Sequence, residues 1–262
     1  MSGARDVWSS FVAIGDSFTE GMDDARPDGT YRGWADLVAE RLAEVTPDFR
    51  YANLAVRGRL FDAVVDEQVP MALRSAPELV TFAAGGNDAL RRGFNPVTLA
   101  TRLHEVVRML SAIGSTVVLF TAADVSQVLP AKRFIAQRVR ALNDATHRVA
   151  VRHDAILIDL FHDEGFHDRR MWSVDRLHLS AAGHRRVASH VLTALKVDPD
   201  PLWDAPLDAV ARSGWVASRK SDVAWARTHL APWVKRRLTG KSSGDTVSPK
   251  RPDLSPWSDD VS

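Results

Sequence analysis

The chain has 262 residues, of which 45% are hydrophobic and 26% charged, and its formal net charge is +1. This composition is typical of a globular protein, and the small net charge favours neither nucleic acid nor a membrane surface as a partner. The absence of cysteine excludes disulfides, thiolate metal sites and a cysteine nucleophile. Since the sequence has neither an apolar run of about 18 residues nor a signal-like start, we expect a cytoplasmic protein without a transmembrane segment.

Short apolar runs alternate along the chain with longer segments of helical period. We expect strands at 11–14, 50–54, 79–84, 116–120 and 155–160, and helices at 34–45, 60–73, 96–113, 131–152 and 180–196. Five strands that alternate with helices predict a parallel five-stranded sheet in a three-layer α/β/α sandwich.

Polar residues and glycines follow several of the predicted strands. Ser17, Gly58 and Asn87 come soon after the first three, whereas Asp175 and His178 lie in a longer loop after the fifth. Ligands of such sheets bind beyond the carboxyl ends of the strands, so we expect these residues to meet at one edge. The segments 22–32 and 122–130 are expected to form part of the rim.

These residue types fit nucleophilic acyl transfer. A serine hydroxyl becomes a useful nucleophile when a histidine removes its proton, and a carboxylate orients that histidine. Ser17 is the candidate nucleophile, His178 the base and Asp175 its partner. The backbone N–H groups of Ser17 and Gly58 and the amide of Asn87 are candidate oxyanion donors. Taken singly, each residue also fits a structural role, such as a helix cap or a turn.

Four segments taken together resemble the four sequence blocks of the GDSL-type SGNH hydrolases. They are Gly15-Asp16-Ser17, the loop at Gly58, Gly85-Gly86-Asn87-Asp88 and the stretch from Asp175 to His184, in the family's order. The resemblance spans about residues 11–195. It implies a flavodoxin-like fold, esterase or lipase activity, and the roles just given for Ser17, Gly58, Asn87, Asp175 and His178. Phe18 departs from the family's common leucine.

We therefore expect a serine hydrolase that cleaves small-molecule carboxylic esters through an acyl-enzyme on Ser17, without a cofactor. The alternatives are an acyltransferase with the same triad, a lysophospholipase or thioesterase, and a non-catalytic binding module. An α/β-hydrolase is disfavoured because no Gly-x-Ser-x-Gly elbow is present. The acyl chain length, the substrate-binding residues and the oligomeric state are left open.

Histidines other than His178 are not expected to take part in catalysis. The loop 162–168 has the residue types of a metal site but no recognised ligand spacing, so we expect no metal. Histidines on predicted helices are expected on solvated faces by default, although His184 could instead pack near the site.

The sequence changes character after residue 197. We expect a hydrolase domain over 1–197, a helical extension over 198–239 and a disordered tail over 240–262. The extension is rich in tryptophan and, between 218 and 241, in Lys and Arg. It could dock on the catalytic domain, cover the site or form an oligomer contact, or touch an anionic surface.

Overall fold

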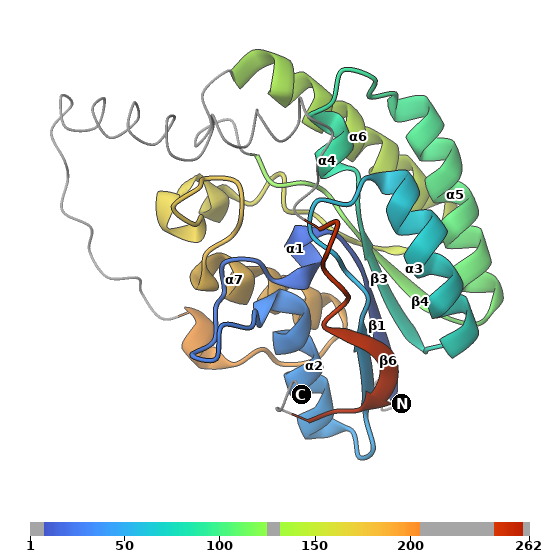
Figure 1. Ribbon diagram of the computed structural model, residues 1–262, viewed down its shortest axis with the longest axis vertical. Coiled ribbons are helices and arrows are strands. Elements are labelled where there is room, and N and C mark those ends of the chain that lie inside the picture. The colour runs from blue at the N-terminus through green and yellow to red at the C-terminus, as the bar shows by residue number, and fades with distance from the viewer. Residues whose placement is uncertain (1–7, 125–131, 205–243, 259–262) are drawn as a thin grey trace, which may run out of the picture.

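A sheet of six strands lies at the centre of the protein. The computed structural model, drawn in Figure 1, describes residues 8–124, 132–204 and 244–258. The strand order is β5-β4-β3-β1-β2-β6. The strands are β1 (Ser10–Gly15), β2 (Arg50–Asn53), β3 (Leu79–Ala83), β4 (Thr116–Phe120), β5 (Ile156–Ile158) and β6 (Arg251–Pro256). The first five are parallel, and β6 pairs antiparallel with β2. The expected α/β/α sandwich is confirmed, with six strands in place of five.

Helices cover both faces of the sheet. One face carries α2 (Gly33–Val45) and α7 (Ala181–Ala194), and the other carries α3 (Phe61–Ser75), α5 (Pro96–Ala112) and α6 (Lys132–His153). Strand β1 shows why both faces are covered: Phe11 and Ala13 pack into one core, whereas Val12 and Ile14 pack into the other. Side chains of a strand alternate between faces, so an unbroken apolar run needs a helix layer on each side.

Capping residues place the helices at the strand ends. The Asn95 side chain accepts hydrogen bonds from the first turn of α5, and the Ser180 hydroxyl accepts one from Gly183 N in α7. The Asp88 carboxylate accepts a hydrogen bond of 2.9 Å from Phe61 N at the start of α3. The short helix α4 (Gly86–Ala89), which contains Asp88, is thereby joined to α3.

The C-terminal part departs from expectation. Disorder was expected throughout 240–262, but residues 251–256 form β6 on the edge of the sheet. Trp257 packs against Tyr51, and the Arg251 guanidinium lies 4.8 Å from the Trp257 ring centre. The segment's prolines and charges obscured the strand, because an edge strand tolerates proline where an inner strand does not. The helix expected within 198–239 falls largely outside the described residues.

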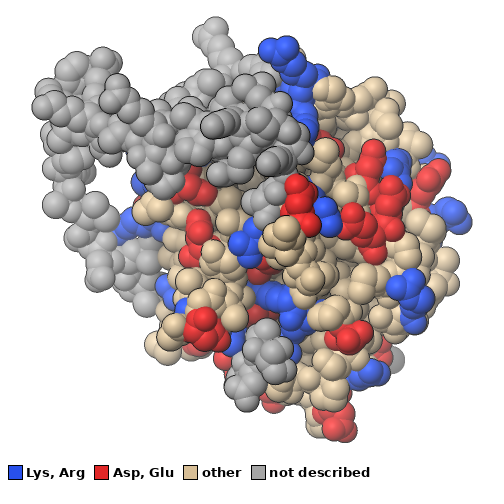
Figure 2. Space-filling view, viewed as in Figure 1, with Lys and Arg blue, Asp and Glu red and all other residues tan. Residues whose placement is uncertain are grey.

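Charged side chains are spread over the visible surface, and the described helices can be compared with what a membrane span requires. On the face drawn in Figure 2, acidic and basic side chains are interspersed over the described residues. No helix in the described ranges combines the length and the apolar character needed to cross a bilayer.

Candidate active site

Ser17 lies at the carboxyl end of β1, as the first residue of the short helix α1 (Ser17–Glu20). The carboxylate of the preceding Asp16 caps this helix by accepting a hydrogen bond of 3.2 Å from Phe18 N. Phe18 packs against Trp34 and Phe120, with ring centres 5.5 and 5.6 Å away. An aromatic side chain at position 18 is therefore accommodated in the core and leaves the Ser17 hydroxyl at the strand end.

His178 joins Ser17 to Asp175. Its Nε2 lies 3.1 Å from Ser17 Oγ, and its Nδ1 lies 2.5 Å from Asp175 Oδ2. The other carboxylate oxygen of Asp175 accepts hydrogen bonds from the backbone N–H groups of Leu177 and His178, at 2.9 and 3.0 Å. These bonds fix the carboxylate against its own turn. The structure thus brings together the three residues that the sequence singled out as nucleophile, base and orienting acid.

Charges around the imidazole set its basicity. Burial disfavours the protonated ring, but the hydrogen bond and charge of Asp175, with smaller contributions from Asp23 and Asp16, outweigh it and raise the pKa of His178. Burial alone would raise the pKa of Asp175, but the hydrogen bond and the charge of His178 outweigh that effect and lower this pKa to about 2. Asp175 is therefore ionised at neutral pH, and His178 is a stronger base than free histidine.

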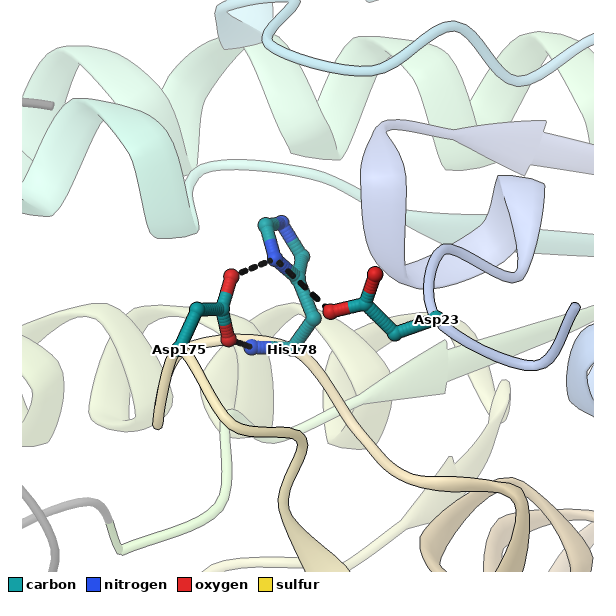
Figure 3. A group of neighbouring side chains, drawn as sticks. All are labelled: Asp23, Asp175 and His178. Atoms are coloured by element: carbon teal, nitrogen blue, oxygen red, sulfur yellow. Dashed lines mark hydrogen bonds and ion pairs between the residues drawn. The ribbon is translucent and has the colours of Figure 1, made fainter. Parts of the chain in front are cut away.

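Asp23 is a second carboxylate beside His178 that sequence reasoning missed (Figure 3). Its Oδ2 lies 3.9 Å from His178 Nδ1, on the loop that follows α1. Its backbone has a left-handed φ of 70°, which is uncommon for a residue other than glycine. The expected rim segment 22–32 contains Asp23, but no local pattern indicated that its carboxylate would turn toward the histidine.

The candidate oxyanion donors differ in their surroundings. Asn87 Nδ2 donates to Asp16 Oδ2 at 3.0 Å and to the carbonyl oxygen of Arg59 at 3.1 Å. Burial raises the pKa of Asp16 to about 6, against the opposing effects of Phe18 N–H and His178. Gly58 has a left-handed φ of 73°, which glycine adopts without strain. Asn87 would have to exchange one of its present acceptors to donate to a substrate oxyanion.

A cavity of about 190 Å³ opens beside Ser17 and is walled mostly by apolar side chains. Ser17, Asn87 and His178 line it, but Gly58 is not among its described lining residues. The rim segments contribute Met22, Ala122 and Ala123, and the remainder of 122–130 lies largely outside the described residues. The apolar wall includes Phe18, Leu90, Phe120, Ile135, Val139 and Leu142.

Two clusters have the residue types of a metal site: the loop 162–168 and the side chains around Asp23. In the loop 162–168, Asp163 bonds to Arg186 and His190, and Asp168 bonds to Arg170. Within the described residues, three possible metal-ligand atoms lie within 4.8 Å of one another at Asp23, Asp175 and His178. There His178 Nδ1 lies 2.5 Å from Asp175 Oδ2, the contact already described beside Ser17.

His184 is fully buried and lines the cavity, so the alternative placement near the site holds and the default of a solvated helix face does not. Its Nδ1 accepts a hydrogen bond of 3.2 Å from Trp34 N, and its Nε2 lies 3.0 Å from the carbonyl oxygen of Met22. Burial lowers the pKa of His184 to about 4. The neutral ring therefore joins α7 to both ends of the loop that carries Asp23.

Comparisons with known proteins agree with this architecture. Esterase TesA of Pseudomonas aeruginosa is 25% identical over 189 residues, which cover 71% of this chain and 88% of TesA. A crystal structure of TesA matches with a TM-score of 0.60 and 25% identity, over 71% of this chain and 98% of that one. A lipase/acylhydrolase from Enterococcus faecalis shares the fold, with a TM-score of 0.58 and 21% identity over 73% of this chain and 98% of its own.

An acetylxylan esterase of Geobacillus stearothermophilus, solved as a catalytic mutant, has a TM-score of 0.61 at 18% identity over 72% of this chain and 95% of its own. The family model of GDSL-like lipases and acylhydrolases matches residues 13–186, a range that includes Ser17, Asp175 and His178. With the sheet order and the relatives already described, this match identifies the chain as a member of the GDSL-like lipase/acylhydrolase family.

Proposed function

We propose that the protein hydrolyses carboxylic esters through an acyl-enzyme on Ser17. The observation that carries the proposal is the 3.1 Å approach of His178 Nε2 to Ser17 Oγ, with Asp175 on the other ring nitrogen, in the wall of an apolar cavity. Membership of an ester-hydrolysing family and the likeness to esterase TesA support it.

In the proposed reaction, neutral His178 takes the Ser17 proton as Oγ attacks the ester carbonyl carbon. The tetrahedral intermediate collapses, the bond to the leaving alcohol breaks, and the imidazolium returns the proton to that alcohol. A water molecule then gives a proton to His178 and attacks the acyl carbon of the acyl-enzyme. The bond to Ser17 Oγ breaks, the imidazolium returns its proton to Oγ, and the acid leaves with Ser17 and neutral His178 restored. Asp175 holds the proton on Nδ1 throughout and stabilises the imidazolium.

The negative oxygen of each intermediate needs donors. Ser17 N–H, Gly58 N–H and the Asn87 amide are the proposed donors, and Asn87 exchanges its bond to the Arg59 carbonyl for one to the substrate. Replacing Asn87 with alanine should lower kcat by about 10²–10³-fold and leave KM nearly unchanged, because the interaction is specific to the transition state. A change confined to KM would reassign Asn87 to substrate anchoring.

The cavity suggests which part of the ester it holds. A volume of about 190 Å³ is below the roughly 300–1,000 Å³ typical of pockets that enclose a drug-sized ligand. We therefore assign the cavity to the acyl group alone and direct the alcohol toward solvent. Because the wall is apolar, burial of a short or medium aliphatic chain is favoured over that of a sugar.

The test is a set of p-nitrophenyl esters of increasing acyl length, assayed with the full chain and with Ser17→Ala. We expect activity to rise from acetyl to medium chains and then to decline, and Ser17→Ala to abolish it while the melting temperature hardly changes. Full activity of Ser17→Ala would reject the proposal. Preferential acyl transfer to an added alcohol would instead identify an acyltransferase.

A further inference from the structure

The C-terminal strap, defined as residues 244–257, lies outside the family match, and its strand β6 pairs with β2 at the edge of the sheet. We propose that this strap is a working part of the active-site scaffold, and that its Lys250 is a positioning residue that fixes α1 and so the Ser17 hydroxyl. The proposal rests on the proposed function of Ser17 and extends it to a segment beyond residues 13–186.

Lys250 is a largely buried cation whose Nζ has three hydrogen-bond acceptors. Its Nζ donates to the carbonyl oxygens of Arg32 and Tyr31, at 2.6 and 3.1 Å, and to Asp36 Oδ2 at 2.9 Å. The Asp36 side chain is 1% exposed and that of Lys250 is 13% exposed. Burial lowers the pKa of Lys250, and the charge of Asp36 opposes that effect. Removal of the cation would leave an uncompensated carboxylate in the core.

A first route runs from Lys250 to α1 through hydrogen bonds. The Tyr51 hydroxyl donates to Asp36 Oδ1 at 2.9 Å. Asn53 Nδ2 donates to the Tyr51 oxygen at 3.1 Å and to the carbonyl oxygen of Thr19 at 3.0 Å. Thr19 belongs to α1, whose first residue is Ser17. Burial raises the pKa of Tyr51 well above its usual value, which keeps its donor proton in place.

A second route is direct backbone packing. Gly21 ends α1 with a left-handed φ of 93°, and Gly33 has a φ of 75°. A Cβ on Gly33 would lie 2.2 Å from Gly21 Cα, and one on Gly21 would lie 2.6 Å from the Arg32 carbonyl oxygen. The backbone whose carbonyls bind Lys250 therefore presses against the end of α1.

A third route passes through the loop before Gly58. A Cβ on Gly244 would lie 2.0 Å from the Arg57 carbonyl oxygen, so the strap contacts this loop closely. Arg57 N donates to Glu20 Oε2 at 2.7 Å, and its side chain pairs with the same carboxylate. Glu20 is the last residue of α1. The strap thus supports both α1 and the peptide next to the candidate oxyanion donor.

Helix α1 needs such support because of its length. It has four residues, too few to be stable by its own hydrogen bonds. Its orientation depends on what surrounds it, and the three routes end at Thr19, Glu20 and Gly21. A small displacement of α1 would move the Ser17 hydroxyl away from His178, and a misplacement of about 1 Å can cost about 10² in rate.

The test replaces Lys250 with methionine in the full chain, with the exposed Asp253→Ala in the same strap as the matched control. Both are assayed below their melting temperatures for kcat and KM, and for amide hydrogen exchange over residues 17–21. We expect Lys250→Met to lower kcat by about 10²-fold with little change in KM and to speed exchange in α1. The control should match the unsubstituted chain in each measurement.

The double variant Lys250→Met with Asp36→Asn separates position from charge. Lys250→Met should also lower the melting temperature, because it leaves the Asp36 carboxylate uncompensated. The double variant removes that carboxylate, so it should regain the melting temperature of the unsubstituted chain, whereas its kcat should stay low and its exchange in α1 fast. Recovery of melting temperature, kcat and exchange together would overturn the proposal, as would normal kcat and normal exchange in Lys250→Met. If that variant does not fold, the double variant carries the test. Hydrogen exchange is independent of the reaction, so a chain in which Ser17 proves not to be the nucleophile still tests the strap.

Discussion

His178 and His184 are both largely withdrawn from solvent and lie close together in the sequence, yet their surroundings give them opposite properties. His178 meets the Asp175 carboxylate, which raises its pKa, whereas His184 meets a carbonyl oxygen and a backbone N–H, and burial lowers its pKa to about 4. Burial alone suppresses protonation, and a charged partner restores it. The first ring is suited to exchanging a proton, and the second to linking the backbone as a neutral group.

The largest expected effect separates the two histidines by activity. Replacement of His178 with alanine should lower kcat/KM for an ester by about 10⁴-fold or more and leave the melting temperature nearly unchanged. The double variant with Ser17→Ala should be no less active than either single variant, because the two residues act in one step. Losses that multiply in the double variant would mean that the residues act independently. His184→Ala should show the reverse pattern, with lower stability and a smaller loss of activity.

Asp175→Asn tests whether the Asp175 carboxylate is what makes His178, unlike His184, able to act as a base. The amide can donate to Nδ1, which places the ring proton on Nε2 and prevents that atom from accepting the Ser17 proton. We expect kcat to fall by up to about 10⁴-fold in steady-state ester hydrolysis, with the fold retained. A variant within a factor of a few of the original activity would show that Asp175 does not set the tautomer.

The pH dependence of stability should report His184. Its pKa is about 4 in the folded protein and near 6.5 when unfolded, so the unfolded chain binds more protons between these values. This contribution to the free energy of unfolding, about 3 kcal/mol at most, is complete above pH 6.5 and is lost as the pH falls toward 4. Chemical denaturation at several pH values gives the free energy of unfolding as a function of pH. Between pH 4 and 6.5 this free energy should rise less steeply with pH in His184→Gln than in the unsubstituted chain. An equally steep rise in both proteins would contradict a buried neutral ring.

The smallest expected effect concerns Asp23. Its charge helps to raise the pKa of His178, so Asp23→Asn should lower that pKa and extend activity to more acidic pH. Because His178 must be neutral to act as a base, kcat/KM rises with pH through its pKa in both proteins. Comparison of the two pH profiles gives the shift. A profile that moved toward higher pH would contradict the assigned sign.

The strands and the central site residues could be predicted because their signals are local. The buried strand β1 contains the unbroken apolar run 11–14, and Ser17 and Asn87 follow within a few residues of strand ends. Parallel topology then brings the strand ends to one edge. The positions of Asp175 and His178 relative to Ser17 are a tertiary result, but their spacing and the family blocks anticipated it.

What the sequence did not predict depends on contacts between distant segments. Strand β6 has two prolines and becomes a strand because the edge of β2 is available to it. His184 lies on an amphipathic helix whose first turn faces the loop between Met22 and Trp34, and no periodicity indicates that contact. Lys250 follows the polar sequence Gly244-Asp245-Thr246-Val247-Ser248-Pro249 and resembles a solvated lysine until Asp36 is placed beside it.

The central claim is that Ser17 is made nucleophilic by His178. The most direct test is reaction of the full chain with a fluorophosphonate, followed by peptide mass spectrometry and repeated with His178→Ala. We expect a single phosphonylated site at Ser17, and a labelling rate that falls at acid pH and is largely lost in His178→Ala. Labelling at another serine, or equally fast labelling of Ser17 without His178, would contradict it.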